Sequence, residues 1–131
     1  MPVKFTVIQK GNPSKPEEPK KFYASAKASG EVTFRSLSKE IAQGSTTVSD
    51  TDVLAVLNDL TKVLSKHLSD GKIVRFGDFG SFQISISSEG AETEDKVTAA
   101  KIKSNKILFR PGIELREMLA VAKYEKAAKG E

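Results

Sequence analysis

Residues 50–82 read DTDVLAVLNDLTKVLSKHLSDGKIVRFGDFGSF and combine two periodicities. In the first part, apolar residues recur at steps of three and four, which predicts one apolar stripe on an amphipathic helix. The stripe consists of Val53, Val56, Leu57, Leu60, Val63, Leu64 and Leu68. Ser49 is the expected N-cap, because Asp50 and Asp52 would then lie at the positive end of the helix dipole. We expect the helix to end near Ser69.

The second part of the same stretch predicts a tight pair of strands. Residues 72–76 are expected to form a short strand, residues 77–80 a turn, and residues 81–87 a second strand. The second strand alternates, with apolar residues on one face: Phe82, Ile84 and Ile86. Glycines inside such a pair indicate a positive φ or a close approach of two backbones.

The residues before this stretch predict another helix and two further strands. Residues 34–43 have a helical apolar side, and Gly44 suits the C-cap. A short Ser/Thr turn over residues 45–49 would lead into the long helix. Residues 3–10 and 21–28 alternate as half-buried strands, and the loop between them contains three prolines. These strands form either a hairpin or two separate additions to the edge of a sheet.

The residues after this stretch return to extended structure and close with a helix. Residues 88–96 are polar and acidic, and we expect an exposed loop or strand tip there. Residues 97–109 are expected to be extended, and residues 110–112 break the strand. Residues 114–122 predict a helix, and the tail beyond Tyr124 is expected to fray. The order of elements, β-β-α-α-β-β-β-α, indicates the α+β class.

The composition favours one globular domain without a catalytic or metal centre. The chain has 131 residues, of which 38% are hydrophobic and 29% charged, as is usual for a single domain. It has no cysteine, and its one histidine, His67, falls at the edge of the helical stripe. A histidine in that position is far more often structural than catalytic, because catalysis needs a partner group. We therefore expect no enzyme activity, metal, cofactor or small-molecule substrate.

The chain carries no sign of a membrane segment. No apolar run approaches the ~18 residues that span a bilayer. Residues 1–10 lack the apolar core of a signal peptide. We expect a cytoplasmic protein without a membrane partner.

The charge of the chain is unevenly distributed. The formal net charge is +4, and the whole excess lies in residues 1–47, with eight Lys/Arg and four Asp/Glu. Residues 87–106 carry four of each sign. A net charge this small is a weak indication of an anionic partner, so a nucleic-acid interpretation has to rest on the pattern of residues.

The order and spacing of these features resemble the HU / integration host factor family of bacterial histone-like proteins. The matching features are the helix ending near Gly44, residues 50–82 with their glycine–phenylalanine–glycine turn, and Phe109-Arg110-Pro111-Gly112 followed by Leu115-Arg116. The last segment is similar to the family's F-x-x-G-x-x-L-K. The resemblance covers about residues 34–120, and residues 1–30 look like the N-terminal extension of an HU-related subgroup.

The resemblance implies an α+β, HU-like fold for residues 1–131 as a single domain. Such a fold has a helical hairpin, a three-stranded sheet with a protruding β-ribbon arm, and a C-terminal helix. The body would span residues 31–123, with the arm at about 87–106. A β-hairpin extension would precede it over residues 1–30, and a frayed tail would follow over 124–131.

The family also implies an intertwined homodimer, and the residues supply a physical reason for one. A helical hairpin with one apolar stripe and a three-stranded sheet leave two apolar faces that need cover. Each side chain buried between two copies would gain about 1.5–3 kcal/mol. The expected dimer core is Val53, Leu57, Leu60, Leu64, Phe79 and Phe82. In the alternative, the N-terminal strands cover these faces in a monomer.

In the family, two arms wrap the minor groove of DNA, and a proline at each arm tip wedges between base pairs. This chain departs from that pattern, because residues 87–106 contain no proline and carry Glu89, Glu92, Glu94 and Asp95 instead. Four carboxylates would repel phosphates. The sequence therefore predicts weaker DNA binding and less bending than is typical of the family.

The basic residues that remain available lie on the returning strand and at or beside family basic positions. We expect the DNA-binding residues to be Arg75, Lys96, Lys101, Lys103, Lys106, Arg110 and Arg116. On an extended strand, Lys101 and Lys103 would share one face. Ile113 stands where the family has a lysine, which removes one contact. The extension adds Lys15, Lys20 and Lys21 as further candidates. For each residue the alternative is a purely solubilising role.

These features predict a non-enzymatic, histone-like protein that binds double-stranded DNA largely without sequence preference. It would act as a nucleoid-associated homodimer in chromosome condensation. A second interpretation is an HU-derived interaction or scaffold module that has lost DNA binding. The acidic arm tip and the added N-terminal strands favour that alternative.

Overall fold

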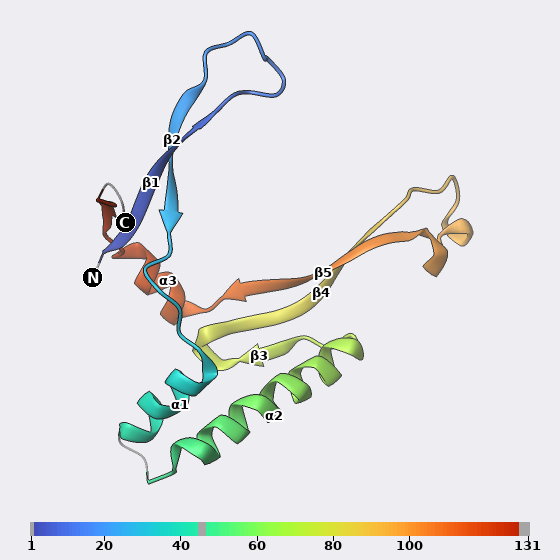
Figure 1. Ribbon diagram of the computed structural model, residues 1–131. Helices are drawn as coiled ribbons and strands as arrows, with labels where there is room; N and C mark the ends of the chain where they lie inside the picture. Colours follow the sequence, from blue (N-terminus) through green and yellow to red (C-terminus); the bar gives the residue numbers. More distant parts are fainter. Residues whose placement is uncertain (1, 45–46, 129–131) are drawn as a thin grey trace. The chain divides into compact units, whose positions relative to one another are not determined.

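The computed structural model describes residues 2–44 and 47–128, which form two compact units (Figure 1). Unit 1 comprises residues 1–33 and 119–131, and unit 2 comprises residues 34–118. The expected Ser/Thr turn between the first two helices includes residues 45–46, which lie outside the described residues. Each unit has its own three-stranded sheet.

The sheet of unit 1 has the strand order β2-β1-β6. Strands β1 (Val3–Lys10) and β2 (Lys21–Lys27) pair in antiparallel fashion, so the hairpin is the correct one of the two arrangements considered above. The proline-rich loop joins them (Figure 1). The expectation of a frayed tail beyond Tyr124 is wrong for its first residues, because β6 (Tyr124–Lys126) pairs in parallel with β1. The backbone bond from Ala127 N to Phe5 O, 2.8 Å long, holds this strand in place.

The two helices of unit 2 follow the pattern of the sequence closely. Helix α1 spans Phe34–Gln43, and α2 spans Asp50–Ser69. Ser49 caps α2 as expected, since its side chain accepts a bond of 3.1 Å from the Asp52 amide. Both carboxylates of the first turn therefore lie at the positive end of the helix dipole.

The sheet of unit 2 has the order β3-β4-β5. Its strands are β3 (Val74–Phe76), β4 (Gly80–Ser88) and β5 (Ile102–Pro111), with the 3-10 turn η1 (Gly77–Phe79) between the first two. The long β4–β5 ribbon protrudes as an arm (Figure 1). Helix α3 (Ile113–Ala120) follows, two residues shorter at its end than expected.

The arm tip differs from the expected extended structure. The expectation of extended structure for residues 97–109 is wrong over residues 99–101, which form the 3-10 turn η3 (Ala99–Lys101). Val97 and Thr98 have extended backbone but belong to no strand. A further turn, η2 (Glu94–Lys96), precedes it. The cross-strand register also shifts at Ser87/Ser88, so the regular ladder ends before the tip.

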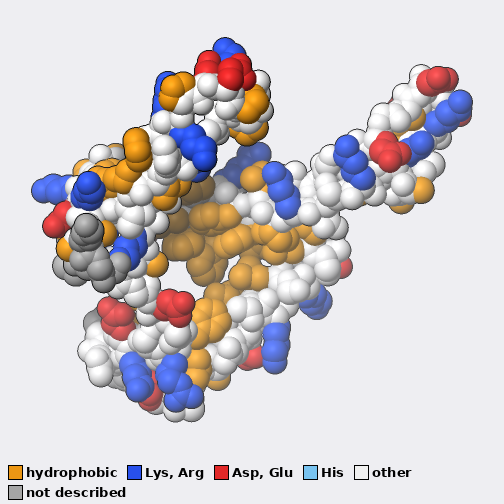
Figure 2. Space-filling model, turned by 45° about the horizontal axis from the view of Figure 1, so that its top comes forward, with side chains coloured by type: hydrophobic (Ala, Val, Ile, Leu, Met, Phe, Trp, Pro, Cys, Tyr) orange, Lys and Arg blue, Asp and Glu red, His pale blue; other side chains and the backbone are white. Residues whose placement is uncertain are grey.

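A closed hydrophobic core is absent from the described part of the chain. Among these residues, no hydrophobic side chain is buried. Figure 2 shows exposed hydrophobic side chains over the body of unit 2 beside the arm. The apolar faces of this unit therefore still need cover.

Candidate nucleic-acid interface

The two faces of the unit 2 sheet have opposite character, and the register sets which residues lie on each. On one face, Val74, Phe82 and Phe109 form one cross-strand row, and Ile84 and Ile107 form the next. This apolar face and α2 line a common hollow that includes Leu64, Leu68, Phe82, Ile84 and Ile107.

Four phenylalanines strengthen the apolar face. The rings of Phe82 and Phe109 lie 4.8 Å apart, and those of Phe79 and Phe109 lie 5.6 Å apart. Phe76 meets Phe79 edge-on at 5.6 Å. Phe79 is nevertheless 43% exposed, so the cluster is open on one side. An aromatic cluster of this kind usually packs against a further apolar surface.

The expected dimer core lies within this region. The four α2 residues and Phe82 are half-buried, while Phe79 is exposed: Val53, Leu57, Leu60, Leu64, Phe79 and Phe82. The expected dimer core does not include three further apolar residues that the single chain leaves exposed. These are Val56 (64% exposed), Val63 (51%) and Ile107 (55%). The helical spacing contained the signal for both valines. Ile107 required the register with Ile84.

The opposite face of the sheet, which we call the polar face, carries basic and hydroxyl side chains, with the pair Gln83 and Leu108 between them. Arg75, Ser81 and Arg110 form one row across all three strands. Lys106 pairs with Ser85 further along the arm. The register thus places three of the expected DNA-binding residues on one face: Arg75, Lys106 and Arg110. Ser81 was not expected, because only the strand register reveals its place between two arginines.

Two glycine-containing turns hold the arginine row in place. Gly80, with φ 151°, pairs with Pro111, and the Gly112 amide donates to the Phe79 carbonyl over 2.8 Å. A Cβ at Gly112 would collide with the Asp78 carbonyl, and one at Gly80 would collide with the Arg110 carbonyl. The two motifs behind the family resemblance are therefore contact partners, which explains why both need glycine.

A shallow hollow lies at this junction. It is lined by Arg75, Gly77, Gly80, Ser81, Arg110, Pro111 and Gly112. Arg116 lies close by in the chain, since its Nε donates to the Gly112 carbonyl over 3.4 Å. Arg75 and Arg110 line the hollow, and Arg116 is bonded to the adjoining Gly112. Three arginines therefore lie around the same glycine-containing turn, where their planar guanidinium groups can bind an anion.

The remaining candidates lie at the arm tip among carboxylates. Lys96 and Lys101 line a hollow with Glu92, and Figure 2 shows acidic and basic side chains together at this tip. The expectation that Lys101 and Lys103 share a strand face is wrong, because Lys101 belongs to η3. Lys103 falls at the shift in register and has no Cα partner there. The tip lysines therefore do not continue the polar face.

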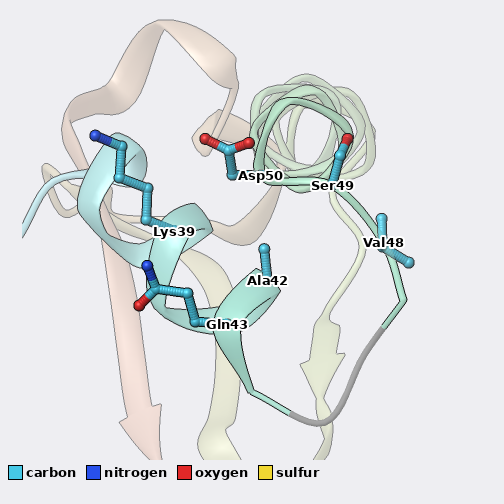
Figure 3. A pocket seen from close by; sticks show the side chains of 6 residues that line it. All are labelled: Lys39, Ala42, Gln43, Val48, Ser49 and Asp50. Carbon is cyan, nitrogen blue, oxygen red and sulfur yellow. The ribbon is translucent and has the colours of Figure 1, made fainter.

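A separate hollow lies between the two helices of unit 2. Lys39, Ala42 and Gln43 of α1 line it together with Val48, Ser49 and Asp50 at the start of α2 (Figure 3). The Ser49 hydroxyl is already engaged as the helix cap. This hollow therefore offers no nucleophile with an adjacent base.

His67 has no catalytic setting in the structure. It is half-buried on α2, and its Nδ1 has no hydrogen-bond partner in residues 2–44 and 47–128. Within the same residues, no group of three His, Cys, Asp or Glu side chains is arranged to hold a metal ion. No helix in the described part of the chain has the length and apolarity of a membrane span.

Comparison with known families decides the identity of the fold. The family model HU-HIG, an HU domain fused to a wHTH, Ig or glycine-rich motif, matches residues 1–126. The chain belongs to the HU-HIG family. HU domains are non-enzymatic, so the prediction that this chain is not an enzyme is confirmed. The match also includes the N-terminal strands, which the resemblance described above placed outside the ordinary HU family.

Solved structures resemble this HU-HIG chain in fold. A protein from Bacteroides vulgatus ATCC 8482, described as a candidate bacterial DNA-binding protein, has a TM-score of 0.62 at 11% identity over 95% of this chain. This chain spans 47% of that protein's length. Anabaena HU, crystallised with DNA, has a TM-score of 0.53 at 19% identity over 69% of this chain and 99% of its own. A search of curated proteins finds no match.

Proposed function

We propose that this HU-HIG chain is a histone-like protein that binds double-stranded DNA largely without sequence preference, as a homodimer. The observation that carries the proposal is the row of Arg75, Ser81 and Arg110 on the polar face. Arginine and serine are typical donors to DNA phosphates, and such contacts carry no sequence information by themselves. Lys106 and Arg116 extend the set of cations around this row. In a bacterial cell, the protein would act in the nucleoid.

The apolar face of unit 2 supports the homodimer. The α2 stripe, the four phenylalanine rings and the isoleucines of the arm are only partly covered in the single chain. A second copy offers the same apolar surface, and self-complementary pairing is the usual solution for such a face. Obligate dimers bury more than 2,000 Å² in total, which requires an extended apolar face on each copy.

The composition of the arm tip supports the prediction that this protein bends DNA only weakly. The tip carries Glu89, Glu92, Glu94 and Asp95, and the arm contains no proline wedge. Insertion of this tip into a minor groove would bring carboxylates close to phosphates. The proposed binding mode therefore uses the polar face and the base of the arm, and the DNA bends less than with HU proteins that carry the wedge.

The same acidic tip favours a second candidate function. A scaffold module derived from HU would keep the dimer surface while its arm binds a basic protein partner. Unit 2 contains twelve Lys/Arg and twelve Asp/Glu, so its net charge gives no general attraction for DNA. Direct measurement of DNA binding separates the two functions.

The test is fluorescence anisotropy of a labelled duplex of about 30 base pairs, titrated with protein at 50 and 200 mM salt. The R75Q/R110Q variant should bind at least about tenfold more weakly at low salt, because two phosphate contacts are lost per chain. K62Q/K66Q, which removes the same charge from exposed positions of α2, is the matched control. Light scattering measures the molar mass of the free protein and shows whether it is a dimer.

Binding by the wild type that weakens at 200 mM salt, with a selective loss in R75Q/R110Q, would support the proposal. Equal losses in both variants would show that the arginine row is not the contact. No binding by a dimeric wild type would favour the scaffold function instead.

A further inference from the structure

The two strands of the N-terminal hairpin carry four charged residues, and all four are lysines on one face. The register pairs Lys4 with Lys27 and Lys10 with Lys21. Since side chains alternate along a strand, residues separated by six positions share a face. Neither β1 nor β2 contains Asp or Glu. We call this set the lysine face: Lys4, Lys10, Lys21 and Lys27.

This arrangement is unfavourable for the hairpin itself. Like charges directly opposite each other destabilise a strand pair, and surfaces that serve only solubility mix both signs. At one end of the face, β6 places Glu125 beside Lys4. At the other end, Lys10 and Lys21 are exposed and pair only with each other in the strand register. A ligand with negative charge would remove this repulsion.

Lys27 lies at the more enclosed end of this face. Its Nζ is covered, and it has no hydrogen-bond partner in the part of the chain that the structure describes. Because a covered atom is out of reach of a ligand, the exposed cations of the lysine face are Lys10 and Lys21.

The rows between the lysine pairs suit a phosphodiester backbone. Thr6 pairs with Ser25, and Ile8 pairs with Tyr23, so three hydroxyl groups lie between the two charged ends. Hydroxyl and ammonium groups are side-chain donors that commonly contact DNA phosphates. Lys10 and Lys21 are exposed and adjacent in the register, and Tyr23 follows on the same face. This end of the lysine face can therefore contact the phosphates of one DNA backbone.

We propose that the lysine face is a second site for the DNA backbone, in addition to the polar face of unit 2. This inference rests on the proposed DNA-binding function and assigns much of its electrostatic contact to the N-terminal hairpin. Unit 1 contains nine Lys/Arg and five Asp/Glu and so carries the entire net charge of +4. Contacts at this face would be independent of base sequence, since they involve phosphates alone.

The experiment measures how the affinity of the full chain for a duplex of about 30 base pairs depends on salt between 50 and 200 mM. The K10Q/K21Q variant removes the unneutralised lysine pair. If each lysine contacts one phosphate, the slope of log affinity against log salt should fall by about 1.8 per chain. The K62Q/K66Q control, with the same loss of charge on α2, should keep the wild-type slope. Circular dichroism checks that both variants fold.

The outcomes separate this site from the proposed function. An unchanged slope in K10Q/K21Q, with a wild type that binds DNA, would overturn the lysine face and leave the proposed function intact. No DNA binding by the wild type would overturn both. A change in the mass of free K10Q/K21Q by light scattering, without a change in slope, would assign the face to a contact with another copy and overturn the site.

Discussion

The two three-stranded sheets of this chain distribute their charges in different ways. In unit 1, every charge on β1 and β2 is a lysine on one face. In unit 2, the cations of the polar face are balanced by carboxylates at the arm tip and on the helices. Unit 1 carries a net charge of +4, and unit 2 carries none. The unit that has the helices and arm of an HU protein is therefore not the electropositive part of this chain.

The sheets also differ in how they are held together. Unit 2 has a glycine junction in which the η1 turn and the end of β5 touch through their backbones. Unit 1 relies on a regular hairpin and a short parallel strand. Substitutions should therefore have large effects on stability at the unit 2 junction and small ones in unit 1.

The largest effect is expected from Gly112→Ala. The new Cβ would collide with the Asp78 carbonyl, which belongs to rigid backbone. We expect a loss of about 3 kcal/mol in the free energy of unfolding, measured by urea denaturation. Gly90→Ala is the control, because a Cβ there meets nothing within 4 Å. Equal stability of the two variants would contradict the close backbone contact between Gly112 and Asp78.

The next effect concerns the apolar face of unit 2. Ile84→Glu places a charge in the hollow shared with α2, which the proposed dimer would bury. We expect the dissociation constant of the dimer to rise about 100-fold or more, measured by analytical ultracentrifugation. Val121→Glu, at a position of unit 1 that is 75% exposed, should leave it unchanged. A wild type that is monomeric at every concentration would refute the dimer.

A smaller effect is expected from the arm tip. Glu92→Gln with Glu94→Gln removes two carboxylates that oppose DNA phosphates. DNA affinity should rise about two- to threefold at 50 mM salt and approach the wild-type value at 200 mM, because salt screens exposed charges. Glu40→Gln with Asp59→Asn, on the helices, controls for net charge. A loss of affinity in the tip variant would indicate that the tip contacts DNA by other means.

The smallest effect should appear in the hairpin of unit 1. Lys21→Glu converts the Lys10–Lys21 repulsion into an attractive cross-strand pair. The β1–β2 amides should gain about 0.2–1 kcal/mol of protection in hydrogen exchange, while DNA affinity falls. Lys20→Glu, in the loop outside the register, should give no such protection. Weaker protection in Lys21→Glu would contradict the interpretation of the lysine face.

Local signals in the sequence predicted most of the elements. The spacing of apolar residues and the Ser49 cap defined α2 from Asp50 to Ser69. Alternation predicted β1, the second hairpin strand and β4. These features depend on neighbours within a few residues, so a short segment of sequence is enough to predict each of them.

Features that depend on residues distant in the sequence could not be predicted from local patterns. The strand β6 has three residues, and its only reason to be extended is the parallel partner β1, far away in the sequence. The 3-10 turn η3 lies where the sequence predicted an extended segment, because the composition there does not distinguish a turn from a strand. Lys101 consequently does not share a strand face with Lys103, and neither belongs to the arginine row.

The order of helices and strands up to α3, the two glycine motifs and the departure of the arm tip from its family follow from the amino-acid sequence alone. The faces of the sheets do not. Arg75 and Ser81 are near each other in the chain, but Arg110 is distant, and the three form one row only through the register of three strands. The lysine face depends in the same way on the pairing of residues 4 with 27 and 10 with 21. A shift of one residue would move every one of these side chains to the opposite face, so the surfaces that bind exist only once the strands have paired.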